Sequence, residues 1–212
     1  YCNTKDIDGI ENGECNPEIM WREERGQRNT LEQDNFPPSL YGNGRINPTQ
    51  NFVDAFPMAN GEPITAEGSG YNKDNPYVDR DPRLALYVVT NGSTQGVANK
   101  TITTAADGTT QDAINKLEGK STRTGYYLRK LMRSDINLDP SKTTTQYHYN
   151  ARIRFTEMFL SYAEAANEAW GPKGKGGHGY SAYDVIKAIR ERAGLGEFGE
   201  DPYLEECAES KD

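Results

Sequence analysis

The sequence predicts a mainly α-helical fold that carries long irregular loops. Residues 152–195 hold two amphipathic helical patterns separated by a Gly/Lys run, whereas residues 1–150 are rich in turn-forming residues. The 212-residue chain has 34% hydrophobic residues, 21 Gly and 11 Pro, and such a core is thin for its length. Its 13 Tyr, 6 Phe and 2 Trp exceed the aromatic content of most disordered chains. We therefore expect a folded chain that is loop-rich or depends on surface supplied by further segments.

The first part of the chain contains few regular elements. Residues 18–21 form a short apolar run, typical of a strand or of a segment inserted into a core. Residues 22–47 read as a long polar loop. A short helix is expected from Asn47 and Pro48 to near Phe56, because a capping residue and a first-turn proline precede it.

The middle of the chain is expected to be mostly loop. Residues 59–81 carry no periodic pattern, and residues 84–90 are apolar with two valines and a tyrosine, which favours a strand. Residues 91–125 are rich in Thr, Gly and Asn. We expect them to form a surface insertion.

The first helix of the pair is predicted by its apolar stripe. Its members recur at three- and four-residue steps: Phe155, Met158, Phe159, Tyr162, Ala163, Ala166 and Trp170. Trp170 is expected to pack rather than to contact a ligand. Gly171 and Pro172 then mark the end of the helix. Residues 171–179 are almost entirely Gly, Lys and Pro, too polar and flexible to pack, so a mobile surface loop is expected.

The second helix has both of its end signals. Ser181 is a suitable N-cap with Asp184 three positions later, and apolar residues follow at helical spacing. Gly194 followed by Leu195 fits a C-terminal glycine cap. The two helices form a predicted hairpin of about the length of one tetratricopeptide unit.

Five motifs in sequence order resemble the SusD/RagB family of nutrient-binding outer-membrane lipoproteins. The first helix carries Arg154, Glu157, Leu160, Tyr162, Ala163, Glu164, Ala165, Asn167 and Glu168 in the pattern of a late helix of that family, and residues 189–195, IRERAGL, resemble the helix that follows it. The other three are residues 48–61, residues 81–84 (DPRL) and residues 124–130 (TGYYLRK). The resemblance implies a SusD-like fold, with a tetratricopeptide-like helical scaffold and a loop-rich ligand-binding part.

The resemblance also implies that most of that scaffold is missing here. Family members are typically twice this length or more, begin with a lipoprotein signal, and continue beyond the Arg-Ala-Gly-Leu element. Since Tyr1 is not an initiator methionine, we expect a fragment from the second half of such a protein; the alternative is a complete small secreted domain. The expected domains are residues 1–150, loop-rich and ligand-facing; residues 151–196, the scaffold hairpin; and residues 197–212, an acidic loop or the start of a helix.

Charge and hydropathy exclude two classes of partner. The net charge of −8, without large Lys/Arg clusters, argues against a nucleic-acid surface. No apolar run approaches twenty residues, so the resemblance places any lipid anchor on a cysteine upstream of Tyr1. Cys2 and Cys15 could form a disulfide in an oxidising compartment or remain unpaired thiols, and Cys207 is left single.

The residues do not suggest catalysis, a metal site or a cofactor. The two histidines, His148 and His178, have no nearby serine or cysteine motif, although assembly in space stays open. The acidic residues between Asp6 and Glu14 lack the spacing of a calcium loop. Asp81, before Pro82, is expected to form a turn. Paired carboxylates are available by chance among 32 acids, so they do not indicate a glycosidase.

Aromatic and amide side chains in loops are the candidate ligand contacts. Tyr and Trp rings stack on flat sugar faces, while Asn and Arg hydrogen-bond to hydroxyl groups. The candidates are Trp21, Arg22, Arg25, Phe36, Tyr41, Asn43, Tyr71 and Tyr77, accompanied by Arg45, Asn72 and Asn75. For Trp21 the alternative is a core position, and for each loop tyrosine it is simple surface cover.

The resemblance implies a non-enzymatic protein on the outer membrane, exposed at the cell surface. It would bind an oligosaccharide and deliver it to a SusC-like TonB-dependent transporter. The alternatives are a peptide- or protein-binding module of the same fold, as in RagB-like peptide uptake, and, less favoured, a glycan-cleaving enzyme.

Overall fold

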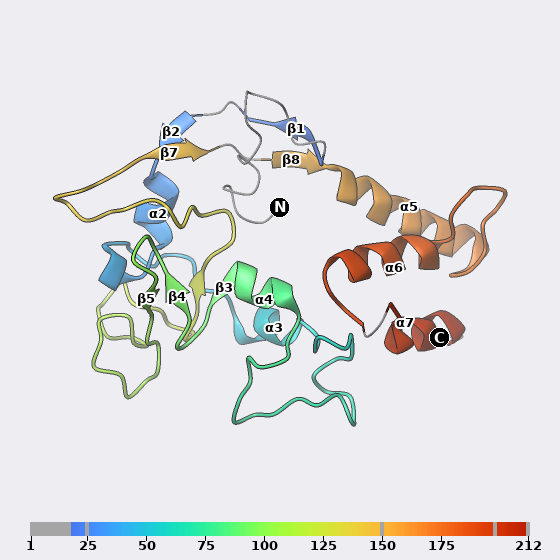
Figure 1. Ribbon diagram of the computed structural model, residues 1–212, viewed down its shortest axis with the longest axis horizontal. Helices are drawn as coiled ribbons and strands as arrows, with labels where there is room; N and C mark the ends of the chain where they lie inside the picture. The colour runs from blue at the N-terminus through green and yellow to red at the C-terminus, as the bar shows by residue number, and fades with distance from the viewer. Residues whose placement is uncertain (1–17, 24–25, 149–150, 197–198, 211–212) are drawn as a thin grey trace. The chain divides into compact units, whose positions relative to one another are not determined.

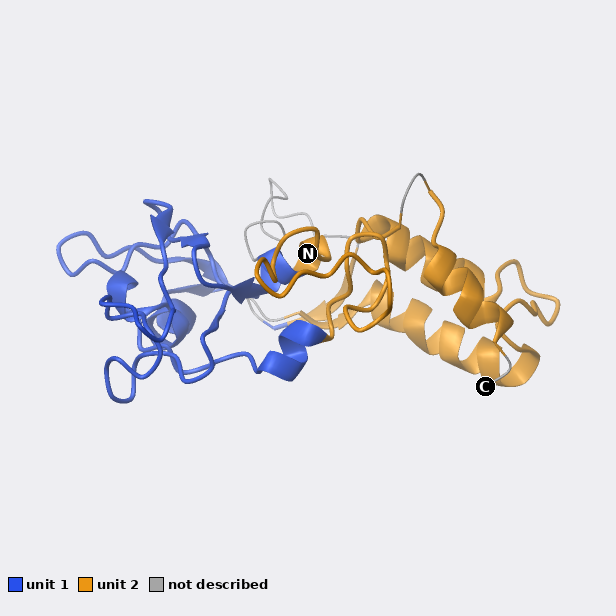
Figure 2. Ribbon diagram, turned by 90° about the horizontal axis from the view of Figure 1, so that it is seen from below, with its two compact units in different colours: residues 1–16, 23–54, 84–150 blue, residues 17–22, 55–83, 151–212 orange. Residues whose placement is uncertain are grey.

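In the computed structural model, residues 18–23, 26–148, 151–196 and 199–210 are described. The chain divides into two compact units, coloured separately in Figure 2. Unit 1 comprises residues 1–16, 23–54 and 84–150, and unit 2 comprises residues 17–22, 55–83 and 151–212. Each unit is therefore assembled from separate stretches, unlike the consecutive domains expected from the sequence.

Unit 1 combines short helices with three two-stranded antiparallel ladders (Figure 1). The ladders pair β2 with β7, β3 with β6 and β4 with β5. Its elements are β2 (Gly26–Arg28), α2 (Thr30–Asn35), η2 (Pro38–Leu40), α3 (Gln50–Asp54), most of α4 (Pro82–Tyr87), β3 (Val88–Val89), β4 (Thr94–Gln95), β5 (Lys100–Thr101), β6 (Tyr127–Leu128) and β7 (Gln146–His148). One of its apolar clusters consists of Phe36, Met132, Ile136 and Leu138.

Two expectations for unit 1 were wrong, and the second failed because polar residues start a helix. Residues 22–47 contain β2, α2 and η2 rather than a continuous loop. Residues 84–87 are helical and only Val88–Val89 form a strand. The carboxylate of Asp81 accepts the Arg83 amide at 2.8 Å, and Pro82 occupies the first turn. This start signal outweighs the β-propensity of the following residues.

Helix α3 lies within the predicted range but has a different cap. The hydroxyl of Thr49 accepts the Phe52 amide at 3.2 Å, whereas the Asn47 side chain accepts the amide of Arg123 at 3.1 Å. Thr49 is thus the capping residue, and Asn47 connects α3 to a distant loop.

The segment 91–125 is mostly exposed, as a surface insertion would be, but it also contributes to the core. Ile102, Ala113 and Thr122 are buried, and Ile102 packs in a cluster with Val89 and Tyr127. Turn hydrogen bonds pair many backbone groups of this segment, so parts of it can be buried with few apolar residues.

Unit 2 is built on one strand pair and a helical hairpin. Strand β1 (Ile19–Arg22) pairs antiparallel with β8 (Ala151–Arg154), which leads into α5 (Phe155–Trp170); α6 (Ala182–Arg192) and α7 (Pro202–Glu209) follow. The presence of α7 shows that residues 197–212 are not a loop throughout. Asp201 starts this helix by accepting the Leu204 amide, with Pro202 in the first turn.

The predicted hairpin and its end signals are confirmed. Gly171, at φ 75°, ends α5, and Ser181 and Asp184 form a reciprocal capping box on α6. Gly194, at φ 83°, ends that helix. The helices pack through Ala163, Ala166, Ala182 and Val185.

Only the small members of the α5 stripe are buried. Phe155, Met158, Phe159 and Trp170 each keep 41–48% of their surface exposed. The 171–179 loop does pack, contrary to expectation: His178 lies 5.1 Å from Trp170 between ring centroids, and a Cβ on Gly176 would meet the Trp170 ring at 2.1 Å. Glycine is what allows this loop to approach the indole.

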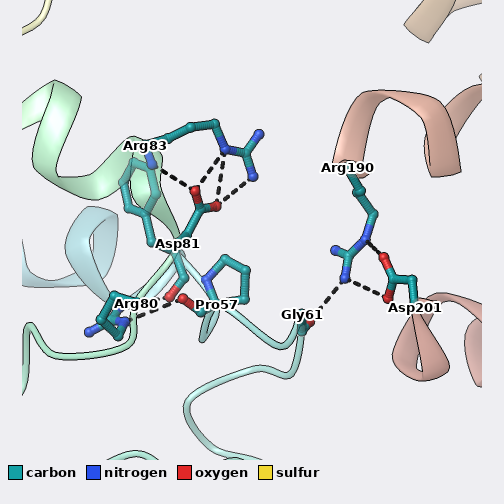
Figure 3. Close-up of polar contacts among 8 residues, drawn as sticks. Pro57, Gly61, Arg80, Asp81, Arg83, Arg190 and Asp201 are labelled. Atoms are coloured by element: carbon teal, nitrogen blue, oxygen red, sulfur yellow. Dashed lines mark hydrogen bonds and ion pairs between the residues drawn. The ribbon is translucent and has the colours of Figure 1, made fainter. Parts of the chain in front are cut away.

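Three of the sequence motifs converge in unit 2 (Figure 3). The Arg190 guanidinium donates to the Gly61 carbonyl at 3.0 Å and pairs with Asp201. Asp81 pairs with Arg83, as its expected turn requires, while Arg80 donates to the Phe56 carbonyl at 2.7 Å. These residues, buried or partly buried, act as scaffold.

Candidate functional site

A cavity of about 540 Å³ in unit 1 gathers the best set of ligand-binding side chains. It is lined by Gln33, Pro38, Tyr41, Gly42, Asn43, Gln111, Leu117, Lys120, Leu138, Pro140 and Thr143. We call it the Tyr41 pocket. It contains two of the residues predicted from the sequence, Tyr41 and Asn43, and its volume suits a small ligand.

One wall of the Tyr41 pocket is the turn that follows α2. The chain reverses after η2, and the Asn43 amide returns to the Gln33 carbonyl at 2.9 Å. A Cβ on Gly42 would lie 2.1 Å from the Phe36 carbonyl oxygen, so this reversal requires glycine. The turn brings Tyr41 and Asn43 beside Gln33 of the helix.

Tyr41 itself has an unusual backbone and an exposed ring. It follows η2 in the left-handed region, with φ 64°, and its side chain is 59% exposed. A non-glycine residue in this region costs about 1 kcal/mol or more. The strain holds an aromatic face at the edge of the pocket instead of in the core.

The opposite walls come from two distant segments. Gln111, Leu117 and Lys120 lie in the segment expected to be a surface insertion, and Leu138, Pro140 and Thr143 lie between β6 and β7. The second segment is fixed by Asp139, whose carboxylate accepts the Ser141 amide and hydroxyl at 2.9 and 2.7 Å. These hydrogen bonds hold the pKa of Asp139 below its ordinary value.

The Tyr41 pocket offers groups that are suited to binding a polar ligand. It offers one exposed ring, three amide side chains, a hydroxyl and an ammonium group. The amides of Gln33, Asn43 and Gln111 can both donate to and accept from sugar hydroxyls. Among the described residues that line the cavity, none is an Asp, Glu, His or Cys that could act as a general acid, base or nucleophile.

The other predicted contacts are not in this pocket. Phe36 is only 1% exposed in the core, so it cannot stack on a ligand, and that prediction was wrong. Arg25 lies outside the described residues. Trp21, Arg22, Tyr71 and Tyr77 belong to unit 2.

Within unit 2 the predicted residues are placed as follows. Trp21 is 61% exposed on β1, so the core alternative was wrong for it, and Arg22 is half-buried on the same strand. Tyr71 and Tyr77 are half-buried, and the Arg80 guanidinium lies 5.5 Å from the centre of the Tyr71 ring. That contact occupies one face of Tyr71.

Sequence reasoning missed Gln33, Gln111, Lys120 and Thr143. They come from three stretches separated by many residues, and none carries a local motif. Only the fold places them together.

A second cavity, of about 590 Å³, lies on the helical hairpin of unit 2. Its lining is more apolar, with Phe159, Val185, Ala188 and Ile189 beside the exposed Tyr180. It offers fewer convergent polar groups than the Tyr41 pocket.

The described residues contain no cluster of three or more His, Cys, Asp or Glu side chains able to hold a metal ion. Over the same residues, no helix is both long and apolar enough to cross a membrane. The predicted Cys2–Cys15 alternatives and the acidic turn before Glu14 fall outside the described part of the chain, and Cys207 is exposed and unbridged.

Solved structures show that this fold is SusD-like. A SusD-like protein from Bacteroides fragilis has a TM-score of 0.64 and 23% identity, covering 92% of this chain and 39% of its own. A SusD-like carbohydrate-binding protein from the same organism has a TM-score of 0.63 and 20% identity, with coverages of 87% and 36%. The chain thus spans less than two fifths of the length of these relatives. No curated protein matches it.

The sequence profile of the SusD family matches residues 17–210. The chain therefore belongs to the SusD family, which confirms the resemblance inferred from the five motifs and the SusD-like fold class.

Proposed function

We propose that this chain is the ligand-binding part of a cell-surface protein that captures a nutrient oligosaccharide and delivers it to a SusC-like, TonB-dependent transporter. The parent protein is held at the outer membrane by a lipid anchor outside this chain, and it binds without cleaving. The relative described as carbohydrate-binding supports the ligand class.

The observation that carries the proposal is the Tyr41 ring. It is exposed, held in a left-handed turn and placed at a cavity whose polar lining consists mainly of amides and a hydroxyl. An aromatic face with flanking amides matches the two surfaces of a sugar: the apolar C–H face and the rim of hydroxyl groups.

Isothermal titration against a panel of neutral and acidic oligosaccharides and short peptides tests the proposal. We expect one class of oligosaccharide to bind, and Tyr41→Ala to weaken it by about thirty-fold, the loss of about 2 kcal/mol at a binding hot spot. Tyr180→Ala is the matched control, because Tyr180 is 66% exposed but lies in unit 2. It should leave binding unchanged.

Three outcomes contradict the proposal. If no compound of the panel binds and no transporter co-purifies, the capture function is refuted. Loss of binding in Tyr180→Ala but not in Tyr41→Ala moves the site to the hairpin cavity. Binding of peptides alone, insensitive to Tyr41→Ala, replaces sugar capture with peptide capture.

A further inference from the structure

A buried histidine–glutamate pair lies behind the Tyr41 pocket. Glu32 of α2 is fully buried, and His148 of β7 is 2% exposed. The two meet at 2.9 Å between Nε2 and Oε1, and Nδ1 of the histidine lies 2.9 Å from the Gln146 carbonyl oxygen. A carbonyl oxygen can only accept, so Nδ1 carries a hydrogen.

The second contact then fixes the proton count. With Nδ1 protonated, a neutral imidazole would present the lone pair of Nε2 to Glu32, which is repulsive if that carboxyl group is ionised. One further proton must therefore lie between Nε2 and Oε1. The same Oε1 also accepts the backbone amide of Arg133 at 2.8 Å. The pair thus holds one proton more than a neutral histidine beside an ionised glutamate.

The surroundings favour keeping that proton. Burial lowers the pKa of His148, but hydrogen bonds to Glu32 and Gln146 and the charge of Glu32 outweigh it and raise the pKa above its ordinary 6.5, against a smaller opposing effect of Arg28. The guanidinium of Arg133 is bound to Asp135 at 2.8 and 2.9 Å. Oε2 of Glu32 is buried and has no hydrogen-bond partner among the described residues. The buried carboxyl group is therefore stabilised through Oε1, by His148 and the Arg133 amide.

The pair connects the segments that form the pocket walls. Gln33, a lining residue, follows Glu32 directly on α2. Leu138, Pro140 and Thr143, which line the other wall, lie in the chain between Arg133 and His148, the two residues bound to Glu32. A further bond, from the Asn29 side chain to the Thr144 carbonyl at 3.0 Å, joins the same two walls.

We propose that Glu32 and His148 form a positioning pair for the Tyr41 pocket, and that their shared proton keeps its two walls in register so that ligand capture weakens at alkaline pH. The effect on ligand capture rests on the proposed function, whereas the effect on the pocket walls does not. Neither residue touches the ligand; both act through Gln33 and the 138–143 wall.

The direction of the pH effect follows from the proton count. A histidine whose pKa is raised on folding contributes its full stability below 6.5, and that contribution is lost as the pH rises through the higher folded value. Deprotonation leaves the buried Glu32 carboxylate facing a lone pair. The walls then lose the contact between Glu32 and His148, one of the contacts that join them.

Amide hydrogen exchange on the ligand-free protein tests the proposal. The Asn43 amide bonds to the Gln33 carbonyl and the Thr144 amide to the Asn137 carbonyl, both at 2.9 Å, so each reports on one wall. We expect their protection factors to fall about ten-fold between about pH 6 and about pH 9, which corresponds to about 1.4 kcal/mol. The Ile102 amide, bonded to the Ser93 carbonyl at 2.9 Å elsewhere in unit 1, serves as the reference and should not change.

Substitutions and the histidine ring separate positioning from general stability. His148→Gln should abolish the pH dependence at Asn43 and Thr144, and His178→Gln, which alters the exposed histidine in unit 2, should retain it. In the unaltered protein the His148 ring signals should titrate above 6.5. The proposal is overturned if the His148 ring titrates at or below pH 6.5, if the protection factors of both walls do not change with pH, or if the Ile102 protection factor falls equally. These measurements use the unaltered protein, so they decide the question even when His148→Gln fails to fold.

A binding measurement completes the test and uses the oligosaccharide of the panel whose binding depends on Tyr41. Its Kd should rise about ten-fold over the same pH range in the unaltered protein and stay constant in His148→Gln. Because the exchange and ring measurements need no ligand, failure of sugar binding would refute the proposed function without refuting the positioning pair. Protection factors that stay constant with pH, together with normal sugar binding, would refute the positioning pair without refuting the proposed function.

Discussion

Removing the hydroxyl of Tyr127 is expected to destabilise unit 1 strongly. This residue of β6 is fully buried, its hydroxyl donates to the Asp112 carbonyl at 2.9 Å, and the same hydroxyl accepts the Thr122 amide at 3.0 Å. Tyr127→Phe keeps the ring but leaves two buried backbone groups without their partner. Each such group costs about 1–3 kcal/mol, so we expect a loss of about 2–6 kcal/mol in the free energy of unfolding.

The same hydroxyl predicts an alkaline transition. Burial raises the pKa of Tyr127 to about 12, the Thr122 hydrogen bond opposes this, and the charge of Asp112 adds to it. The folded state therefore favours the neutral phenol, whose contribution is intact below the ordinary value of 10 and is lost as the pH rises through 12. Two pKa units correspond to about 3 kcal/mol. The phenylalanine variant should lack this part of the alkaline loss.

Urea unfolding followed by near-ultraviolet circular dichroism measures the effect, with Tyr126→Phe as the matched control. The Tyr126 hydroxyl donates to the exposed side chain of Gln50 at 2.8 Å, and the loss of this hydrogen bond should cost about 1 kcal/mol. The protein's two tryptophans both lie in unit 2, and their fluorescence provides an internal reference. Equal losses in the two variants would refute the argument that Tyr127 satisfies two buried groups.

Two further predictions concern unit 2 and can be followed by tryptophan fluorescence during urea unfolding. Arg190→Met should lower the free energy of unfolding by about 3 kcal/mol, because it leaves the Asp201 carboxylate, 5% exposed, without its ion-pair partner; a loss below about 1 kcal/mol would contradict a structural role for this pair. Gly176→Ala should shift the emission spectrum and cost about 1–3 kcal/mol, since its Cβ would meet the Trp170 ring at 2.1 Å. Gly177→Ala, with a similarly positive φ but open space around it, should cost only about 1 kcal/mol of backbone strain and leave the spectrum unchanged.

The helical hairpin could be predicted because its signals are local. The α5 stripe, the Gly171 stop and the Ser181–Asp184 box each lie within a few residues, and helix formation responds to that range. The same reasoning failed where short polar signals decided the outcome: Asp81 and Pro82 began a helix in a segment with strand propensity. Local patterns identify long elements more reliably than brief ones.

The candidate site could be predicted only in part, for a related reason. Tyr41 and Asn43 were selected because an aromatic ring and an amide lie close together in one loop. Their neighbours in the pocket, Gln111 and Lys120, come from a distant polar segment with no local motif, and only the fold brings them to the pocket. The sequence therefore predicted two residues of the proposed site but not the rest of its walls.

The motifs that identify the family and the side chains that we propose for binding have different physical roles. Arg190 and Asp81 belong to these motifs and form partly or fully buried ion pairs, Arg190 with Asp201, and a change at one of them leaves a charge uncompensated. Tyr41 is exposed and strained, so its replacement costs the fold little. Ligand preference can then change at Tyr41 and its neighbours while the scaffold stays constant, so family membership alone does not specify the ligand. Substitutions at the Tyr41 pocket, measured for binding and stability together, are the way to separate the two roles.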